Sequence, residues 1–296
     1  MHYLALCIIA VIAIIQYRRY IRCSYYQVTK NSPLQVYLDK GKLGEYMTYK
    51  YLRGAENNGA KFLFNIYIPK GEEETTEIDV LMIHAKGLFV FESKNYSGWI
   101  FGNEYHKNWY QTLPKGRGRS QKETFYNPVM QNRGHIKHLK ALLGEDVPMH
   151  SVITFSERCT LKSVEVKSAD VSVINRGDVY HTVASICSKI ENPLLSDEQI
   201  IVMYEKLYPY TQVDAATKTQ HIENIEKKLD PASVQEPPYM RTCPRCGGSL
   251  VLRTASRGAN AGNKFYGCSN YPKCRYVVRL SATEAIAAIS MDPRPR

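Results

Sequence analysis

The stretch EIDVLMIHAKGLFVFESKNYSG, residues 77–98, determines the fold expected for this chain. Residues 78–83 and 88–91 are two runs rich in β-branched, aromatic and other apolar side chains, and the turn-like residues 84–87 separate them. Such a pattern predicts a strand, a tight turn and a second strand. Because both runs are almost continuously apolar, both faces of the hairpin are expected to be buried.

Three charged residues lie in this apolar hairpin. Strand side chains alternate between faces, so Glu92 and Lys94 share one face. A turn centred on residues 85–86 pairs Asp79 with Glu92, and a turn centred on residues 86–87 pairs Asp79 with Lys94; only the intermediate register separates the three. Charges near a sheet core are costly to desolvate, and a divalent metal bound by the carboxylates compensates that cost. The alternative is an ordinary, hydrated ion pair at the strand ends.

The pattern resembles the D…(D/E)-x-K core of restriction-endonuclease-like nucleases, and more specifically the nuclease-related domain called NERD. The resemblance runs from about Lys40 to Val173. Its pieces are GKLGEYMTYKYL (41–52), the hairpin, NPVMQNRGHIKHLKALLG (127–144) and VITFS (152–156). It implies an α/β fold with a restriction-endonuclease-like core, in which helices flank a central mixed sheet.

The resemblance also implies roles for individual residues. Asp79 and Glu92 match the metal-binding carboxylates, and Lys94 matches the catalytic lysine. Glu45 matches an additional acidic residue, and Gln131 matches a glutamine that some members place beside the site. The implied activity is that of a deoxyribonuclease that uses Mg²⁺ or Mn²⁺, with Lys94 positioning water or stabilising the pentacovalent charge. Helix-surface solvation of Glu45 and helix capping by Gln131 are the alternatives.

Residues 127–144 predict a helix with its start near this site. Asn127 followed by proline is a typical helix start, and Gly144 is a typical end. Gln131 then falls in the first turn, where free backbone N–H groups favour a nearby phosphate or carboxylate. His135 and His138 lie three residues apart, but no third metal ligand is spaced to assist them, so surface or phosphate-facing histidines are expected.

The segment between the hairpin and this helix is expected to contain two short aromatic strands within residues 99–114. Residues 115–122, KGRGRSQK, predict a Gly-spaced basic loop in which Lys115, Arg117 and Arg119 contact a phosphate backbone. A merely solvated loop is the equal alternative.

The N-terminal residues 3–15, YLALCIIAVIAII, form an unbroken apolar run, and three arginines follow within residues 18–22. The run is shorter than the roughly 20 residues of a spanning helix, although Tyr17 and Tyr20 could extend it as interfacial anchors. A secretory signal carries its positive charge before the apolar run, not after it. The run therefore predicts a single-pass anchor in the lipid bilayer of the cell membrane, with the bulk of the chain in the cytoplasm. A re-entrant or peripheral insertion is the alternative.

Near the C-terminus, residues 243–274 contain C-x2-C and C-x5-C pairs. Two close thiolate pairs on Pro/Gly turns suit a tetrahedral structural Zn²⁺, whereas disulfides are disfavoured in the cytoplasm. Residues 241–280 resemble the zinc ribbon of bacterial type I topoisomerases, which implies binding of DNA, often single-stranded. The expected ligands are Cys243, Cys246, Cys268 and Cys274.

The ribbon also carries most of the positive charge. Residues 241–296 hold ten Lys/Arg against two Asp/Glu, which is eight of the chain's net +11. The side chains expected to contact phosphates are Arg245, Arg253, Arg257, Lys264, Lys273 and Arg275; those expected to stack on bases are Phe265, Tyr266, Tyr271 and Tyr276.

These features divide the chain into six expected parts. They are a membrane anchor (1–22), a polar connector (23–39), a NERD nuclease-like domain (40–210), a linker (211–240), the zinc ribbon (241–282) and a tail (283–296). The expected function is a membrane-anchored, metal-dependent nuclease that captures double- or single-stranded DNA through its ribbon. The alternative is a catalytically inactive nucleic-acid-binding tether at the membrane.

Overall fold

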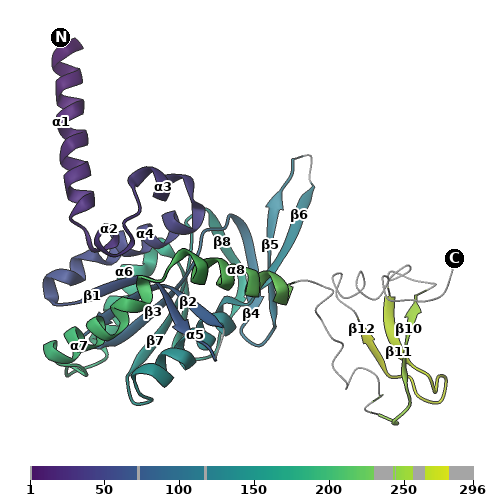
Figure 1. Ribbon diagram of the computed structural model, residues 1–296. Coiled ribbons are helices and arrows are strands. Elements are labelled where there is room, and N and C mark those ends of the chain that lie inside the picture. The colour runs from purple at the N-terminus through teal and green to yellow at the C-terminus, as the bar shows by residue number, and fades with distance from the viewer. Residues whose placement is uncertain are drawn as a thin grey trace. The chain divides into compact units, whose positions relative to one another are not determined.

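The computed structural model describes residues 2–71, 74–116, 119–229, 243, 245–255 and 264–279. The chain divides into two compact units, residues 1–217 and 218–296 (Figure 1). The first unit contains a five-stranded and a four-stranded sheet, and the second contains a three-stranded sheet. The expected tail, residues 283–296, and residues 230–240 of the expected linker lie outside the described residues.

The five-stranded sheet is mixed, with strand order β1-β2-β3-β7-β9. The pairs β1/β2 and β2/β3 are antiparallel, and the pairs β3/β7 and β7/β9 are parallel. The strands are β1 (Lys61–Pro69), β2 (Thr75–His84), β3 (Gly87–Lys94), β7 (Met149–Phe155) and β9 (Val171–Asn175). The expected central mixed sheet is therefore confirmed.

The turn of the β2–β3 hairpin is centred on residues 85–86, one of the two registers expected to bring the charged residues together. His84 pairs with Gly87 and Val80 pairs with Phe91, so the next position along the ladder sets Asp79 opposite Glu92. Gly87 has φ +114°, a conformation that favours glycine just after the turn. Residues 80–83 and 88–91 are all fully buried, which confirms that both faces of the hairpin are covered.

Two helices cover opposite faces of this sheet. On one face, Thr48 of α4 (Lys40–Leu52) lies 3.3 Å from Thr154 of β7. On the other, Asn132 of α5 (Pro128–Leu143) donates to the carbonyl oxygen of Val90 in β3. The remaining helices of the first unit's core are η1 (Arg53–Asn58), η2 (Arg176–Asp178), α6 (Val179–Ser188), α7 (Asp197–Leu207) and η3 (Tyr208–Thr211).

A second, four-stranded sheet was only partly expected. Its order is β6-β5-β4-β8, with β4 (Gly98–Asn103), β5 (Asn108–Pro114), β6 (Ser120–Tyr126) and β8 (Cys159–Glu165). The two aromatic strands are confirmed as β4 and β5, but the expected loop over residues 115–122 was wrong at its end, because Ser120–Lys122 belong to β6. Strands β6 and β8 lie at the sheet edges and are largely polar, so they carry little apolar alternation in the sequence.

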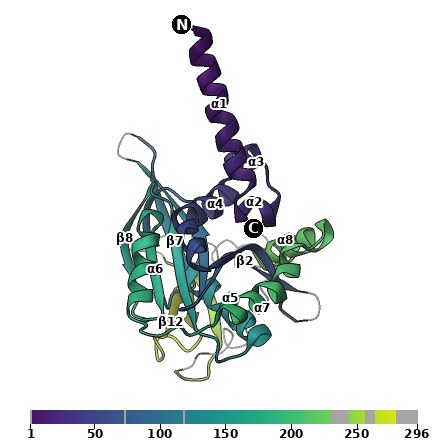
Figure 2. The same ribbon diagram turned by 90° about the vertical axis from the view of Figure 1, so that its left-hand side faces the viewer.

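The N-terminal helix α1 (His2–Ile21) extends away from the body, and its last turns meet α2 and α4 (Figure 2). Within it, Tyr3–Ile21 has a mean hydropathy of 1.8 and is long and apolar enough to cross a membrane. By the same measure of length and composition it could also be a signal sequence.

The segment expected to be a polar connector, residues 23–39, is instead part of the folded body. It forms the short helices α2 (Ser24–Thr29) and α3 (Pro33–Leu38), from which Tyr25, Val28 and Val36 enter the hydrophobic core. Helices of six residues are too short to display an apolar stripe in the sequence, which is why the segment looked polar.

The expected linker, residues 211–240, begins with the helix α8 (Ala215–Leu229). In the second unit, β10 (Leu250–Thr254), β11 (Lys264–Cys268) and β12 (Val277–Arg279) form an antiparallel sheet. The buried residues of its small core are Cys243, Cys268 and Cys274, with Leu250 and Tyr276 packed against them.

Candidate active site and zinc ribbon

The end of β3 and the first turn of α5 bring three of the expected site residues together. The Lys94 Nζ atom lies 2.7 Å from Oε1 of Glu92 and donates to Oε1 of Gln131 at 3.1 Å. Glu92 is 1% exposed, whereas the Lys94 side chain keeps 17% of its surface open. The lysine, unlike Glu92, is therefore partly open to solvent.

Asp79 joins the cluster from the neighbouring strand. The backbone N–H of Ser93 donates to Oδ2 of Asp79 at 2.7 Å. This bond holds the aspartate beside the β3 segment that carries Glu92 and Lys94. The side chain of Asp79 is half-buried. Its second oxygen, Oδ1, has no hydrogen bond within the described part of the chain.

The position of His135 corrects the sequence expectation. His135 is buried, not at the surface: its Nε2 lies 3.0 Å from Oε2 of Glu92, and its Nδ1 lies 2.7 Å from Oγ1 of Thr76. A carboxylate only accepts hydrogen bonds, so Nε2 carries the proton toward Glu92. His135 follows Gln131 by four residues and shares its helix face, a spacing that could have linked the two in the sequence.

The cap of α5 fixes where Gln131 and His135 point. The Asn127 side chain accepts from the N–H groups of Val129 and Met130, as its sequence predicts. Its Nδ2 also donates to the carbonyl oxygens of Asn103, Glu104 and His106. The helix start is thereby fastened to the β4–β5 connection.

Glu45 lies in α4 and is buried, at 9% exposure. Its Oε2 atom has no hydrogen-bond partner among the described residues. Burial, followed by the charges of Glu77 and Asp39, raises the pKa of Glu45 to about 8. A buried carboxylate of this kind is stabilised when a cation comes close to it.

The charges within the cluster shift the pKa values in opposite directions. Burial, and then the Glu92 and Glu45 charges, raise the pKa of Asp79 well above its ordinary value. Burial also acts to raise the pKa of Glu92, but the Lys94 charge and the His135 contacts outweigh it and hold that pKa low. For Lys94, burial is outweighed by Glu92 and Asp79, so its pKa is raised and the ammonium stays charged.

The donor set fits a hard divalent cation. Glu45 and Asp79 offer oxygen atoms without partners, and their raised pKa values mark an excess of negative charge that a cation would neutralise. Both oxygens of Glu92, in contrast, are already engaged by Lys94 and His135. A cation that used Glu92 would have to share it with these two side chains.

A buried arginine that was not expected from the sequence contacts Ser93 on the face of the sheet that α4 covers. Arg176, at 2% exposure, contacts Oγ of Ser93 at 3.4 Å and Oγ1 of Thr48 at 3.3 Å. A Cβ at Gly44 would come within 2.8 Å of the same Ser93 Oγ. The close approach of α4 to β3 therefore requires glycine at this position.

The basic hairpin tip lies apart from this cluster. Lys115 and Arg119 are exposed at the end of the β5–β6 hairpin, and Arg117 lies outside the described residues. Lys115 follows Trp109, at the base of the hairpin, by six residues, which is about 20 Å of extended chain. Figure 1 shows the hairpin projecting from the body.

The four expected zinc ligands do come together. Their sulfur atoms all lie within 4.8 Å of one another, with Cys243 Sγ 3.7 Å from Cys274 Sγ and Cys246 Sγ 3.3 Å from Cys268 Sγ. These separations are far longer than a disulfide bond of about 2 Å. They are close to the spacing of about 3.8 Å between sulfurs around a tetrahedral zinc with bonds of about 2.3 Å.

Hydrogen bonds to the thiols further suit a metal. The Gly248 N–H lowers the pKa of Cys246 to about 6, and Asn270 donates to the Sγ atoms of Cys246 and Cys268. Burial raises the pKa of Cys268 to about 12. The cluster supports a structural Zn²⁺, whose charge would keep all four sulfurs deprotonated.

The side chains expected to bind nucleic acid surround this cluster in part. Tyr271 is 59% exposed, and the Arg253 guanidinium lies 5.7 Å from the centroid of its ring. Phe265 and Tyr266 are half-buried on β11. Exposed charges are contributed by Arg245, Lys273 and Arg275, whereas Arg257 and the Lys264 side chain lie outside what the structure describes.

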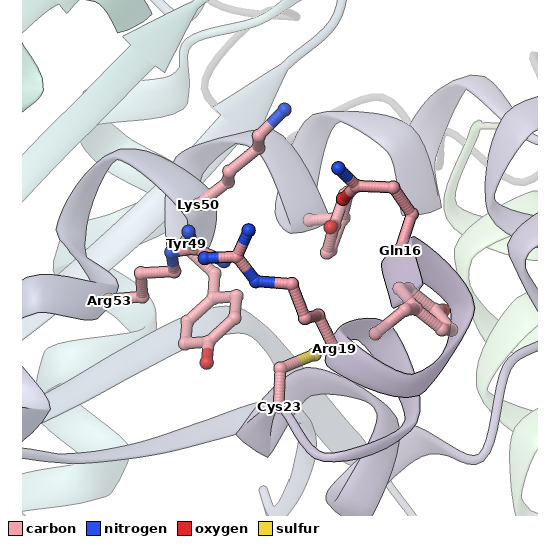
Figure 3. Close-up of a pocket in the computed structure, with 8 residues that line it drawn as sticks. Gln16, Arg19, Cys23, Tyr49, Lys50 and Arg53 are labelled. Atoms are coloured by element: carbon pink, nitrogen blue, oxygen red, sulfur yellow. The ribbon is translucent and has the colours of Figure 1, made fainter. Parts of the chain in front are cut away.

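A pocket of about 110 Å³ lies at the base of α1 and shares no lining residue with the cluster around Glu92. In Figure 3, Arg19 extends from α1 toward Lys50 and Arg53. None of these three cations forms an ion pair within the described residues. The pocket is thus a concentration of positive charge directly beside the apolar helix.

Comparison with protein families finds a match in each of these two regions of the chain. Residues 40–156 match the nuclease-related domain (NERD), and residues 240–283 match the topoisomerase DNA binding C4 zinc finger. The chain therefore contains a NERD domain and a topoisomerase-type C4 zinc ribbon, as the sequence motifs predicted. No solved structure matches the chain.

Relatives of known sequence each resemble part of the chain. An uncharacterised protein of Bacillus anthracis is 29% identical over 190 residues, which cover 64% of this chain and 85% of that protein. DNA topoisomerase 1 of Methanocaldococcus jannaschii is 46% identical over 46 residues, 16% of this chain but 5% of that enzyme. DNA topoisomerase 1 of Helicobacter pylori is 46% identical over 77 residues, 26% of this chain and 8% of that enzyme. The chain spans less than a tenth of these topoisomerases.

Proposed function

We propose that the protein is a membrane-anchored, metal-dependent nuclease that hydrolyses DNA phosphodiester bonds and holds DNA through its zinc ribbon. The observation that carries the proposal is the convergence of Lys94 with Glu92 and Gln131 at the first turn of α5. A charged lysine at a helix N-terminus suits a phosphate group, and the carboxylate oxygens of Asp79 and Glu45 that have no hydrogen-bond partner among the described residues suit a hard cation.

The roles of the residues follow from their contacts. Asp79 and Glu92 would hold Mg²⁺ or Mn²⁺, with Glu45 nearby, and the ion would polarise the phosphate and activate water. Lys94, which Glu92 and Gln131 hold in place, stabilises the negative charge that develops on the phosphate. Lys94 and then His135 keep Glu92 ionised, and His135 also contacts its second carboxylate oxygen.

The membrane part of the proposal rests on α1 and the charge around its end. The helical segment Tyr3–Ile21 is almost entirely exposed, since 6% of its apolar stretch is buried. Arg18 and Arg19 lie in its last turn, and Lys50 and Arg53 join Arg19 in the adjoining pocket (Figure 3). Positive charge at this end supports a cytoplasmic location for the nuclease-related domain.

One observation favours the alternative of an inactive tether. Both Glu92 oxygens are occupied by Lys94 and His135, so the ion has to compete for this ligand. In the tether, these contacts would only stabilise the fold, and binding to nucleic acid would come without cleavage.

The test is cleavage of double- and single-stranded DNA by the full chain in mild detergent, with Mg²⁺ and with EDTA, beside Asp79→Asn. Asp146→Asn is a matched control, because Asp146 is exposed after α5. The nuclease predicts cutting that needs Mg²⁺, is lost in Asp79→Asn and persists in the control. Salt-sensitive binding with no cutting under Mg²⁺ or Mn²⁺ would support the tether instead.

A further inference from the structure

The four-stranded sheet has one buried and one open face. Ile100 and Trp109 are fully buried on the inner face, where Gln111 is also buried. The residues that alternate with them point the other way, and among these Trp99 is 52% exposed and Tyr126 is 44% exposed. Trp99, near the start of β4, thus presents about half of a large ring to solvent.

Strand register arranges the aromatic rings of the open face side by side. Phe101 pairs with Tyr110 across β4 and β5, and their rings stack with centroids 4.9 Å apart. Trp99 lies two residues before Phe101 on the same face. The result is a row of rings on β4 and β5, continued on β6 by Tyr126.

Lysine side chains lie over these rings. The Lys122 Nζ lies 3.6 Å from the centroid of Tyr110, and the Lys162 Nζ lies 5.6 Å from that of Trp99. Farther along the hairpin, Lys115 and Arg119 add exposed positive charge. Aromatic rings and lysines therefore lie side by side on the open face, a combination that suits the bases and phosphates of a nucleic acid.

Acidic residues of this sheet lie away from the centre of the open face. Glu123 points to the inner face, where it accepts from Gln111 at 2.6 Å. Glu165 is exposed on the open face, but it lies at the end of the edge strand β8, where it accepts from Asn103 at 2.9 Å. The centre of the open face is therefore positive and aromatic.

The open face is joined directly to the candidate active site by the chain. Strand β4 begins four residues after Lys94, and β6 ends at Tyr126, immediately before the cap of the helix that carries Gln131. Two ends of strands in this sheet therefore lie within a few residues of the candidate active site along the chain.

We propose that this open face binds single-stranded nucleic acid, with bases stacked on Trp99 and Tyr126 and phosphates on Lys122 and Lys162. Unpaired bases are required because a duplex hides the base faces that stack on protein rings. The inference rests on the proposed function in taking nucleic acid as the ligand, but it does not require cleavage. It assigns to the nuclease-related unit a binding surface of its own, separate from the ribbon.

Intrinsic fluorescence tests this surface directly, because the chain contains two tryptophans and Trp109 is fully buried. The experiment titrates the full chain in mild detergent and EDTA with a fluorescently labelled oligothymidine, following label anisotropy and tryptophan emission together. We expect the emission of Trp99 to be quenched as the oligonucleotide binds, with little quenching by a duplex of equal length. Trp99→Phe should abolish the quenching while preserving a stacking ring.

Affinity provides the second readout. Trp99→Ala is expected to weaken single-strand binding about tenfold, a typical effect of losing one stacked base. Tyr180→Ala is the matched control, since Tyr180 is 58% exposed on α6, away from the sheet. Binding with unchanged tryptophan emission would overturn the proposal and leave the ribbon as the binder; absence of binding, or equal quenching by a duplex, would overturn it as well. Loss of cleavage with Trp99 still quenched would count against the nuclease alone.

Discussion

The nuclease-related unit and the zinc ribbon differ in what fills their cores. The first buries large apolar side chains, among them Trp109, Phe62 and Phe89, around two sheets. The described part of the ribbon buries Cys243, Cys268 and Cys274 in their place. A large apolar core is stable enough to offset the desolvation cost of a buried charged cluster. A small core of cysteines needs its bound metal in order to fold. The same kind of change, removal of one ligand, should therefore have different consequences in the two regions.

The largest effect should come from breaking the ribbon. Cys268→Ser is expected to unfold the ribbon and release its zinc, because metal binding supplies about 10–16 kcal/mol of folding free energy in zinc-finger peptides. The body should keep its own thermal transition. Zinc content, limited proteolysis and DNA binding measure this, with Cys187→Ser as the control in the body. A Cys268→Ser protein that keeps stoichiometric zinc would contradict the assignment of that ligand.

A smaller effect should follow from removing His135 in the body. His135→Ala removes the hydrogen-bond partner of Glu92 Oε2 and of Thr76 Oγ1, both in buried residues, at a cost of about 1–3 kcal/mol. For a unit of this size the melting temperature should fall by about 2–12 °C. His138→Ala on the same helix is the control and should change it little. Equal melting temperatures for both variants would show that the His135 contacts contribute nothing to stability.

The pH dependence of stability should reveal the buried carboxylates. With a pKa of about 8 in the folded protein against an ordinary 4.5, Glu45 keeps a proton that the unfolded chain has released. Stability should therefore fall as pH rises from about 4.5 to about 8, by at most about 1.4 kcal/mol per pH unit from this group. Asp79, whose pKa is also raised, acts in the same direction.

Urea unfolding in EDTA at several pH values measures this slope. Glu45→Gln should flatten it, and exposed Glu145→Gln should not. A slope identical in the wild type and Glu45→Gln would show that this carboxyl is ionised in the folded protein. Added Mg²⁺ should also flatten the wild-type slope, since a cation favours the ionised carboxylate.

The smallest effect should come from the hairpin tip. Lys115→Ala or Arg119→Ala should each weaken DNA binding about threefold and reduce the salt dependence of log K by up to about one, as expected for one lost phosphate contact. Lys137→Ala, an exposed change on α5, is the control. Salt titrations that give the same slope for all three variants would leave the tip as a solvated loop.

Much of the body could be predicted because its signals are local. The β2–β3 hairpin is apolar on both faces with a short turn, and strand alternation alone puts Glu92 beside Lys94. Asn127 and Gly144 mark the two ends of α5. The four zinc ligands of the ribbon could be predicted from the spacing of the cysteines, because two close pairs on turns are typical of a tetrahedral zinc site.

The parts that were missed depend on contacts between distant segments. The spacing of His135 in α5 fits an exposed position as well as a buried one. His135 is buried because it contacts Thr76 and Glu92, which lie 43 or more residues away in the sequence. Tyr25 enters the core from a short helix whose sequence looks polar. Edge strands such as β6 form because β5 offers an unpaired edge, a reason that their own sequence does not contain.

The measurement that tests the central claim most directly is single-turnover DNA cleavage by Lys94→Ala beside its DNA-binding affinity. Loss of the ammonium should reduce the cleavage rate by about 10²–10³-fold, because it removes charge stabilisation from the transition state. DNA affinity should stay within about twofold, since the ribbon retains its charge. Lys137→Ala should match the wild type in both readouts. A Lys94→Ala protein that cuts DNA at the wild-type rate would contradict the assignment of the active site.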